Sequence, residues 1–309
     1  MVCQGTVTVL VTGATGFVGS QVVRQLVASG EDVAVIVRPG SLRRRLEGVI
    51  DRVQVLEADL ADSAAIARLL EACKPDACIH AAWFAEPGKY LDSARNLDSL
   101  RSSFDFLERL ANAGCLHLVG IGTCFEYQMQ RTTLTEDSPV RPFTLYAAAK
   151  LAFYLVAAQR AAQLGMGLAW ARLFYLYGPY EDERRVVPAA IKALSAGRAF
   201  AGTSGEQVRD YLHVEDVASG LCALSRHRLS GAFNVCSSEP VTIADLMRTL
   251  GELLGRPELI RLGALPNRER DPEYVCGDNH RLRTEAHWAP RYALRDGLAQ
   301  TIEWWRKAA

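Results

Sequence analysis

The feature that most constrains this chain is a glycine-rich turn directly after a run of β-branched residues near the N-terminus. Residues 7–11 read Val-Thr-Val-Leu-Val, and Gly13, Gly16 and Gly19 follow before a helical pattern that runs to residue 29. Glycines here let the chain turn tightly, let a pyrophosphate approach the backbone and let the helix pack close to the strand. The amides at the helix N-terminus favour phosphate. The sequence therefore predicts a dinucleotide site on a strand–turn–helix unit.

Strand-like and helix-like segments alternate through the first half of the chain. Amphipathic stretches around 64–73, 96–111 and 146–164 separate the later apolar runs, which lie at 33–37, 53–56, 77–80, 116–121 and 168–175. Such alternation predicts a parallel sheet with right-handed crossovers. Because the runs lack polar alternation, we expect both faces of the sheet to be covered. A short run at 232–236 could add a seventh strand.

Charge and cysteine content narrow the range of partners. Lys plus Arg number 35 and Asp plus Glu number 35 in the 309 residues, so net charge gives no reason to expect nucleic acid or a membrane surface. No stretch of 18 uncharged apolar residues occurs, which predicts no membrane span. The eight cysteines form no CxxC pair and no zinc-like spacing, which predicts reduced thiols and no metal. The N-terminus reads as a first strand and not as a signal peptide, and we expect a cytoplasmic protein.

A tyrosine and a lysine are spaced to act together. Tyr146 and Lys150 lie four residues apart on a predicted helix, so their side chains share one face. A nearby ammonium favours phenolate and lowers the pKa of a tyrosine from about 10. The pair therefore indicates a proton-transfer group. The structural alternative is a helix face on which the tyrosine docks against a dimer partner.

Several motifs together resemble the extended short-chain dehydrogenase/reductase family, and its NAD-dependent epimerase/dehydratase, or nucleotide-sugar, branch in particular. They are the GxxGxxG turn, the YxxxK pair, the segment 119–127 and the segment 207–217, which reads QVRDYLHVEDV. The resemblance covers nearly the whole chain. It implies a Rossmann doubly wound parallel sheet of about seven strands and a smaller mixed α/β substrate domain. We expect residues 1–175, joined by 210–232, to form the NAD(P)-binding domain, and residues 176–209 and 233–309 to bind a nucleotide sugar.

The resemblance also implies the residues that contact the cofactor. The end of the second strand carries Arg38, followed by Ser41, where an NAD enzyme would carry an acid for the ribose hydroxyls. Because a guanidinium binds a 2′-phosphate well, we favour NADP(H), with NAD(H) as the alternative. The other expected cofactor contacts are Gly13, Thr15, Gly16, Phe17, Val18, Gly19, Asp59, Leu60, Ala81, Ala82, Tyr146 and Lys150.

The resemblance implies a catalytic hydroxyl and a substrate side as well. Thr123, after the fifth strand, would bond the reacting sugar oxygen and orient it toward Tyr146. Arg209 and Arg268 would bind the diphosphate of a nucleotide-diphosphate sugar, although the family's glycine near the second arginine is Arg270 here. The remaining expected substrate contacts are Tyr175 and Val187. His213 and Asp216 are expected to be structural, at the start of the next helix.

The positions after Thr123 narrow the reaction. Family dehydratases carry Asp and Glu where this chain has Cys124 and Phe125, and phenylalanine cannot transfer a proton. Epimerase-reductases would have Cys at 125 and His at 180, where this chain has Phe125 and Tyr180. We therefore expect an NADPH-dependent 4-ketoreductase acting on a 4-keto-6-deoxyhexose. The alternatives are a 4-epimerase with tightly bound NAD and, in another class, a non-catalytic NADP-binding redox sensor. Family members dimerise through helices that correspond to 96–111 and 146–164, so we expect a homodimer.

Overall fold

The computed structural model describes residues 8–267 and 271–308. Its centre is a sheet of seven parallel strands in the order β10-β6-β5-β4-β1-β2-β3. These strands are β1 (Thr8–Thr12), β2 (Asp32–Val37), β3 (Gln54–Glu57), β4 (Ala77–His80), β5 (His117–Thr123), β6 (Gly167–Leu173) and β10 (Gly231–Val235). The predicted Rossmann sheet is confirmed, including its seventh strand. Strand order reverses between β1 and β4, the point where doubly wound sheets bind ligands.

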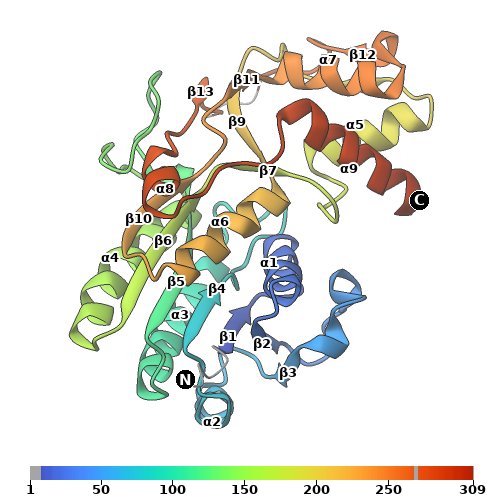
Figure 1. Ribbon diagram of the computed structural model, residues 1–309. Coiled ribbons are helices and arrows are strands. Elements are labelled where there is room, and N and C mark those ends of the chain that lie inside the picture. Colours follow the sequence, from blue (N-terminus) through green and yellow to red (C-terminus); the bar gives the residue numbers. More distant parts are fainter. Residues whose placement is uncertain (1–7, 268–270, 309) are drawn as a thin grey trace.

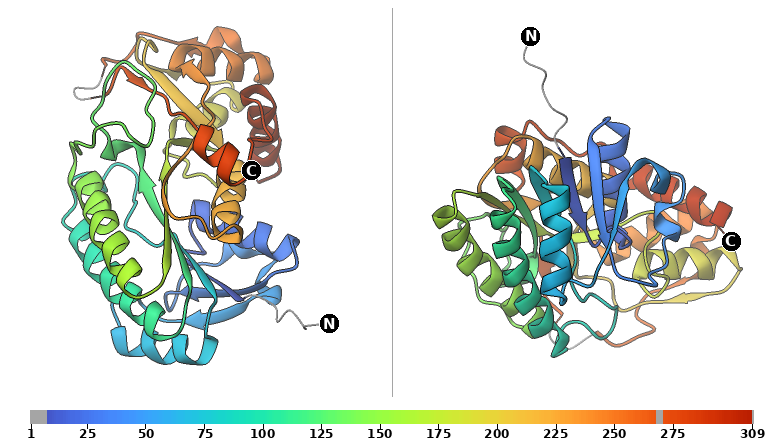
Figure 2. Two further views of the ribbon diagram at one scale, coloured as in Figure 1. Left: turned by 60° about the vertical axis from the view of Figure 1, so that its left-hand side comes forward. Right: turned by 90° about the horizontal axis from the view of Figure 1, so that it is seen from below.

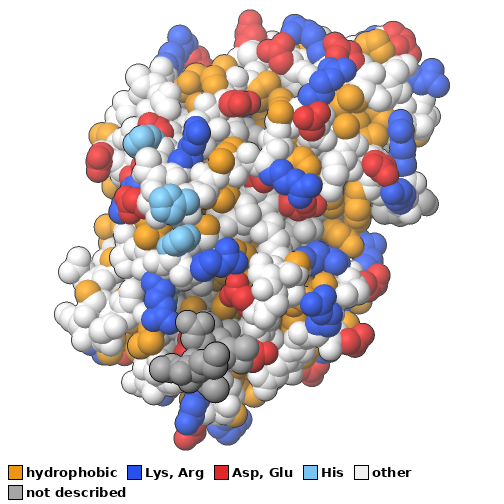
Figure 3. Space-filling model, in the orientation of Figure 1, with side chains coloured by type: hydrophobic (Ala, Val, Ile, Leu, Met, Phe, Trp, Pro, Cys, Tyr) orange, Lys and Arg blue, Asp and Glu red, His pale blue; other side chains and the backbone are white. Residues whose placement is uncertain are grey.

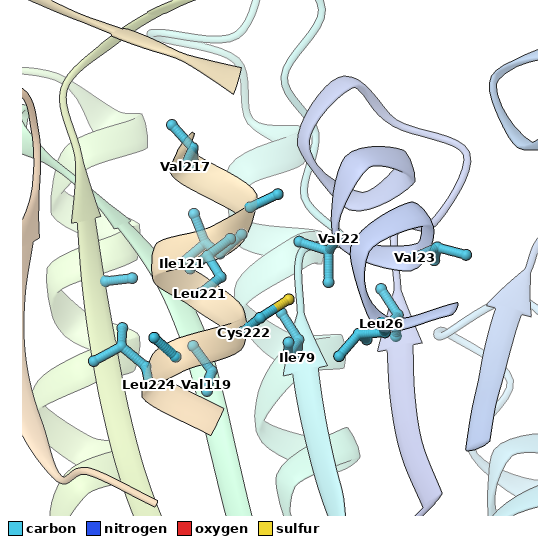
Figure 4. Packing of buried hydrophobic residues seen from close by; sticks show 14 of the residues in the cluster. Val22, Val23, Leu26, Ile79, Val119, Ile121, Val217, Leu221, Cys222 and Leu224 are labelled. Carbon is cyan, nitrogen blue, oxygen red and sulfur yellow. The ribbon is translucent and has the colours of Figure 1, made fainter. Parts of the chain in front are cut away.

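Helices cover both faces of this sheet, in three layers (Figures 1 and 2). One face carries α1 (Phe17–Ala28) and α6 (Val214–Arg226), and the other carries α2 (Ser63–Cys73), α3 (Arg95–Asn112) and α4 (Leu145–Gln163). Each face therefore has its own apolar core. On the first face, Val22 and Leu26 of α1 meet Leu221 and Cys222 of α6 above the strands (Figure 4). The expectation of a sheet buried on both sides is confirmed.

The rest of the described chain forms a smaller mixed unit beyond the carboxyl ends of these strands (Figure 1). Its strands are β7 (Tyr175–Tyr177), β8 (Phe200–Ala201), β9 (Val208–His213), β11 (Pro240–Thr242), β12 (Ile260–Arg261) and β13 (Tyr274–Val275). Its helices are α5 (Val186–Ser195), α7 (Ile243–Leu254) and α9 (Leu294–Ala308), whereas α8 (His280–Glu285) packs beside β10 and adds Leu282 to the first core of the central sheet. A third apolar core joins α5, α7, α9 and β9. The exact division into domains stays a prediction.

Short 3₁₀ turns complete the described chain. They are η1 (Arg44–Leu46), η2 (Ile50–Arg52), η3 (Cys124–Glu126) and η4 (Pro257–Leu259). The turn η3 begins where β5 ends, so the end of that strand leads directly into the candidate site.

Surface features agree with the zero net charge. Basic and acidic side chains are interspersed over the face in Figure 3. None of the helices in the described ranges is both long and apolar enough to span a bilayer. Leu97 of α3 and Leu155 and Val156 of α4 are exposed, and these two helices pack side by side. The homodimer expected through α3 and α4 stays a prediction.

Candidate active site

The glycine turn is held against the end of β4 by contacts that admit no side chain. Gly13 has a φ of +67°, and a Cβ on it would lie 2.6 Å from the carbonyl carbon of Ala81 and 2.7 Å from the nitrogen of Ala82. A Cβ on Gly19 would lie 2.2 Å from the Gly13 oxygen. Gly16 caps α1 without a side-chain hydrogen bond, so its first-turn amides are left for a ligand. This narrow cradle fits the pyrophosphate of a dinucleotide, and Thr15, Phe17 and Val18 lie half-buried along it.

A buried histidine fixes the opposite wall of this cradle. His80 shares hydrogen bonds with Thr12 Oγ1, at 2.7 Å, and Ser103 Oγ, at 3.0 Å. The Ala82 amide donates to the same Thr12 hydroxyl at 3.3 Å. Burial, with the Lys150 charge nearby, lowers the pKa of His80 to about 3, so the ring is neutral. Hydrogen bonds among the neutral His80, Thr12 and Ser103 therefore fix the end of β4, where the predicted contacts Ala81 and Ala82 follow.

The ends of β2 and β3 carry the residues expected around the adenosine. Arg38 is exposed and makes no side-chain hydrogen bond within the described ranges, while the Ser41 amide donates to its carbonyl at 3.1 Å. Asp59 is exposed, and its Oδ1 accepts from the Ala61 amide at 2.9 Å. Leu60 packs on the core beneath. Arg38 thus stands free at the position where a 2′-phosphate is expected.

Two of the three arginines at positions 43–45 already have partners, and Arg43 pairs with Glu57. Arg45 donates to the Tyr180 carbonyl at 3.0 and 3.1 Å and to the Thr15 carbonyl at 3.3 Å. It therefore links the glycine turn to the loop after β7. Burial and the neighbouring Arg44 charge lower the pKa of Arg45.

The three predicted catalytic residues come from β5 and α4. Thr123 ends β5, where its Oγ1 accepts from the Phe125 amide at 3.3 Å. The helix that carries Tyr146 and Lys150 starts at the Thr144 cap, whose side chain accepts from the Ala147 amide at 3.2 Å. Lys150 is 3% exposed, and its Nζ donates to the Ile121 carbonyl at 2.7 Å. The same Nζ lies 5.9 Å from the centre of the Tyr146 ring.

The expected effect of the lysine on the tyrosine is wrong for this structure. The pKa of Tyr146 is raised, because the half-buried phenol is partly removed from water and lies near Tyr90, Glu126 and Cys124, while Arg185 acts in the opposite direction. Lys150 does not offset this, since burial lowers its own pKa to about 7 and its ammonium is bonded to β5. Tyr146 is therefore a protonated phenol, and it can donate a proton to an alkoxide.

Two residues beside the catalytic pair were missed by the sequence reasoning. The Trp83 ring lies 4.0 Å from Lys150 Nζ, in a cation–π contact, and its Nε1 donates to Asn96 at 2.9 Å. Asn96 is fully buried and also donates to the Tyr90 carbonyl at 2.6 Å. One side chain thus ties both ends of the 83–90 loop. Trp83 directly follows the predicted contact Ala82, and that adjacency was the only available signal.

The 83–90 loop meets the loop after β7 over Tyr146. The Tyr90 ring touches the Tyr146 ring edge-on, with centroids 4.8 Å apart. The Arg185 guanidinium lies 5.4 Å from the Tyr90 centroid, and Arg184 lies 3.8 Å from Glu86. Tyr146 lies half-buried beside these two loops, where Tyr90 favours the neutral phenol and Arg185 opposes it.

The expected substrate residues are only partly brought together. Tyr175 packs against Phe125 at 6.1 Å and lies 5.1 Å from the Arg209 guanidinium. Arg209 is 2% exposed and already pairs with Asp271 Oδ1 at 2.6 Å, so an anion would have to share or displace that carboxylate. Val187 is 1% exposed within the third core, and its role as a substrate contact stays a prediction. Arg268 lies outside the described residues.

The expected structural roles of the residues at the start of α6 are confirmed in kind. His213 caps α6 by accepting from the Glu215 amide at 3.3 Å. Asp216 accepts instead from the amides of Arg291 and Tyr292, at 2.9 and 3.0 Å. Within the described residues, no group of three His, Cys, Asp or Glu side chains could hold a metal ion.

Comparisons with known proteins match this geometry over nearly the whole chain. The model of the NAD dependent epimerase/dehydratase family matches residues 9–236. A UDP-glucose 4-epimerase from Lactobacillus helveticus is 24% identical over 329 residues, covering 97% of each chain. A dTDP-4-dehydro-6-deoxy-D-allose reductase from Streptomyces bikiniensis is 28% identical over 319 residues, covering 97% of this chain and 96% of its own.

A solved structure shares the fold at similar coverage. The crystal structure of DesIV, a dTDP-glucose 4,6-dehydratase from Streptomyces venezuelae with NAD and TYD bound, has a TM-score of 0.86 at 25% identity and covers 97% of each chain. By their names, these three relatives carry out three different reactions on nucleotide sugars. Similarity alone therefore does not select the reaction.

Proposed function

The chain belongs to the NAD dependent epimerase/dehydratase family of nucleotide-sugar enzymes, and from that premise we propose that it is an NADPH-dependent 4-ketoreductase. Its substrate would be a nucleotide-linked 4-keto-6-deoxyhexose, and its product the 4-hydroxy sugar. A reductase of a related keto sugar is among the relatives, at 28% identity.

The observation that carries this proposal is the chemistry of the turn after β5. Cys124 is 3% exposed, and burial raises the pKa of its thiol. Phe125 packs against Phe143 and Tyr175. Neither side chain can carry the protons that water elimination requires, so Thr123 is the polar group that this turn offers to a sugar. A hydroxyl, a phenol and an ammonium are the protein groups that reduction of a carbonyl needs once a nicotinamide supplies the hydride.

Each of the three residues has a role that suits its surroundings. Thr123 would donate to the sugar carbonyl oxygen and hold it toward Tyr146. When bound, NADPH supplies the hydride. Tyr146, kept protonated by its raised pKa, would supply the proton that turns the developing alkoxide into the alcohol. Lys150 would hold positive charge beside the phenol.

The preference for NADPH rests on the end of β2. Arg38 is exposed there and has no side-chain hydrogen-bond partner among residues 8–267 and 271–308, and the sequence has no acid at that position. A guanidinium would form a bidentate pair with a 2′-phosphate. It has no acceptor for the ribose hydroxyls of NAD. The cradle formed by Gly13, Gly16 and Gly19 would hold the pyrophosphate of either dinucleotide.

The test is oxidation of NADPH by the purified protein with dTDP-, CDP- or GDP-4-keto-6-deoxyhexoses, compared with NADH. We expect Tyr146→Phe to lower kcat by about 10²–10⁴-fold. Tyr154→Phe is a matched control, because Tyr154 stacks on Trp170 at 5.4 Å two turns further along the same helix, and it should change kcat less than about twofold. Turnover that survives Tyr146→Phe unchanged would falsify the catalytic assignment.

The alternatives give different results in the same assay. A 4-epimerase would purify with NAD and interconvert sugars without added cofactor, and one relative at 24% identity carries that name. A redox sensor would bind NADPH and turn over none of the sugars. We further expect a cytoplasmic homodimer that pairs through α3 and α4, where Leu97, Leu155 and Val156 are exposed.

A further inference from the structure

A fully buried carboxylate lies directly behind the catalytic hydroxyl. Glu126 is 0% exposed, and its Oε1 accepts from the Thr123 amide at 2.9 Å. It also accepts from Trp170 Nε1 at 3.1 Å and from Arg172 Nε at 2.9 Å. Every one of these partners is a donor, so a proton on the carboxyl would find no acceptor among them. The arrangement holds Glu126 as a carboxylate, although burial raises its pKa against the effect of Arg172.

The sheet makes room for this carboxylate by omitting side chains. A Cβ on Gly122 would lie 2.6 Å from Glu126 Oε1 and 2.4 Å from Trp170 Nε1. A Cβ on Gly120 would lie 2.6 Å from the Trp170 ring. The two glycines of β5 therefore open a slot on the face that α4 covers, and Glu126 and Trp170 fill it.

Lys150 reaches the same strand from α4. Its ammonium bonds the Ile121 carbonyl, while Glu126 bonds the Thr123 amide two residues further along. Alternate residues of a strand point their backbone groups to the same edge and lie roughly 6–7 Å apart. A buried cation and a buried anion therefore share one edge of β5, with little water to screen them.

We propose that Glu126 is a positioning residue for the catalytic pair: through the Thr123 amide it fixes the hydroxyl, and from behind β5 it provides the counter-charge that keeps Lys150 an ammonium. The inference rests on the proposed roles of Thr123 and Lys150. Glu126 touches neither substrate nor cofactor, because its oxygens are enclosed by Thr123, Trp170 and Arg172.

The other groups around Lys150 leave Glu126 as its anionic neighbour in the described part of the chain. His80 on β4 is neutral, with its pKa lowered to about 3. Trp83 offers a ring face, Tyr146 a protonated phenol and Ile121 a carbonyl. Burial lowers the pKa of Lys150 to about 7, and Glu126 acts in the opposite direction. Without the Glu126 charge, the pKa of Lys150 must therefore fall further, so that Lys150 loses its proton at lower pH.

The test is the pH profile of kcat/KM for Glu126→Gln, which keeps an acceptor for Thr123 but removes the charge. We expect about a tenfold loss at pH 7.5 relative to the natural protein and about threefold or less at pH 5.5, because the alkaline limb moves down. Glu136→Gln is the matched control. Glu136 accepts from the Asn234 amide at 2.7 Å in the same polar network, but it is not among the charges that act on Lys150.

A folding failure would not end the test. If Glu126→Gln does not fold, the double variant Glu126→Gln/Arg172→Met removes both buried charges and takes its place. An unchanged alkaline limb in a folded variant overturns the proposal, and so does a loss that is equal at every pH, since the latter shows alignment of Thr123 alone.

A second readout separates this proposal from the proposed function. The chain has five lysines, so the signal of Lys150 in protein labelled with ¹³Cε-lysine can be assigned with Lys150→Met. If none of the sugars is turned over, the ketoreductase proposal fails, yet the NMR titration of Lys150 still decides this one. A lower Lys150 pKa in the Glu126 variant supports it, and an unchanged pKa overturns it.

Discussion

Two buried glutamates flank the candidate active site, and their surroundings are opposite. Glu126, after β5, is 0% exposed and receives hydrogen bonds from Thr123, Trp170 and Arg172. Glu181, in the loop after β7, is 8% exposed, and its Oε2 has no hydrogen-bond partner in the described structure. Burial raises the pKa of Glu181 to about 8, with Arg185 opposing.

The difference shows that burial alone does not fix the state of an acid. The donors around Glu126 come from the sheet itself, so its charge is held in place by the same elements that make the core. Glu181 borders a surface pocket of about 360 Å³ that is also lined by Arg45, Tyr180 and Trp304. Because it is buried and its Oε2 has no donor within the described residues, its raised pKa keeps a proton on it at neutral pH. We infer that the first acid serves the electrostatics of the site, and we expect the second to make the stability of the folded chain depend on pH.

The largest loss of stability is expected when Glu126, the acid whose hydrogen-bond partners are all in place, is removed. Glu126→Leu leaves Arg172 buried and unpaired, at a cost of about 3–5 kcal/mol in the free energy of unfolding. Urea denaturation at pH 7 would measure it. The control is Glu57→Leu, which removes the exposed partner of Arg43 and should cost about 0–1 kcal/mol. Equal losses in the two variants would contradict the importance assigned to the buried network.

A smaller loss of stability is expected if Glu126 stays but the space that Gly122 leaves for it is filled. Gly122→Ala places a methyl group 2.4 Å from Trp170 Nε1 and 2.6 Å from Glu126 Oε1. Because both atoms are held by hydrogen bonds, we expect a loss of about 3 kcal/mol and a marked fall in kcat. Gly202→Ala is the control, since its Cβ would meet only Leu262 at 3.5 Å. Full activity in folded Gly122→Ala would mean that the slot tolerates crowding.

Local patterns in the sequence predicted the sheet, its order of helices and the cofactor cradle. The glycine spacing after β1 and the apolar runs are patterns of neighbouring residues. Each strand is buried because its own residues are apolar, so the local sequence is enough to predict it. The role of Glu126 could not be read in this way, because it depends on Trp170 and Arg172, which lie 44 and 46 residues away.

The same limit explains the errors at the site. The pairing of Arg209 with Asp271 spans 62 residues, and the raised pKa of Tyr146 arises from desolvation and from neighbours distant in sequence, such as Tyr90 and Glu126. Residue spacing predicted that Tyr146 and Lys150 share a helix face, but it gave no information on burial. The sign of the pKa shift therefore came out wrong, although the same two residues remain our candidates for catalysis.

The contribution of Glu181, the buried acid with an unpartnered Oε2, to the free energy of unfolding should depend on pH. Glu181 is protonated more readily in the folded chain, with a pKa of about 8, than in the unfolded chain, where the usual value is 4.5. The folded state then binds more protons between these values, so its stability falls as pH rises from about 5 to 8. In Glu181→Gln this fall should shrink by about 3 kcal/mol, measured by urea denaturation at both pH values. A difference between the two proteins that does not grow with pH would show that Glu181 is charged throughout.

The smallest effect is expected at the exposed acid that links the two loops. Glu86 bonds Lys89 and lies 3.8 Å from Arg184 across the site, and all three side chains are substantially exposed. Water screens such contacts, so Glu86→Gln should leave the melting temperature unchanged within error. The aromatic contact of Tyr90 with Tyr146 and the hydrogen bond from the buried Asn96 would still hold the loop. If the melting temperature fell as much as in Gly122→Ala, the position of the 83–90 loop would depend on exposed charges. Stability on this side of the site would then not be set by the buried groups, contrary to what the comparison of Glu126 with Glu181 implies.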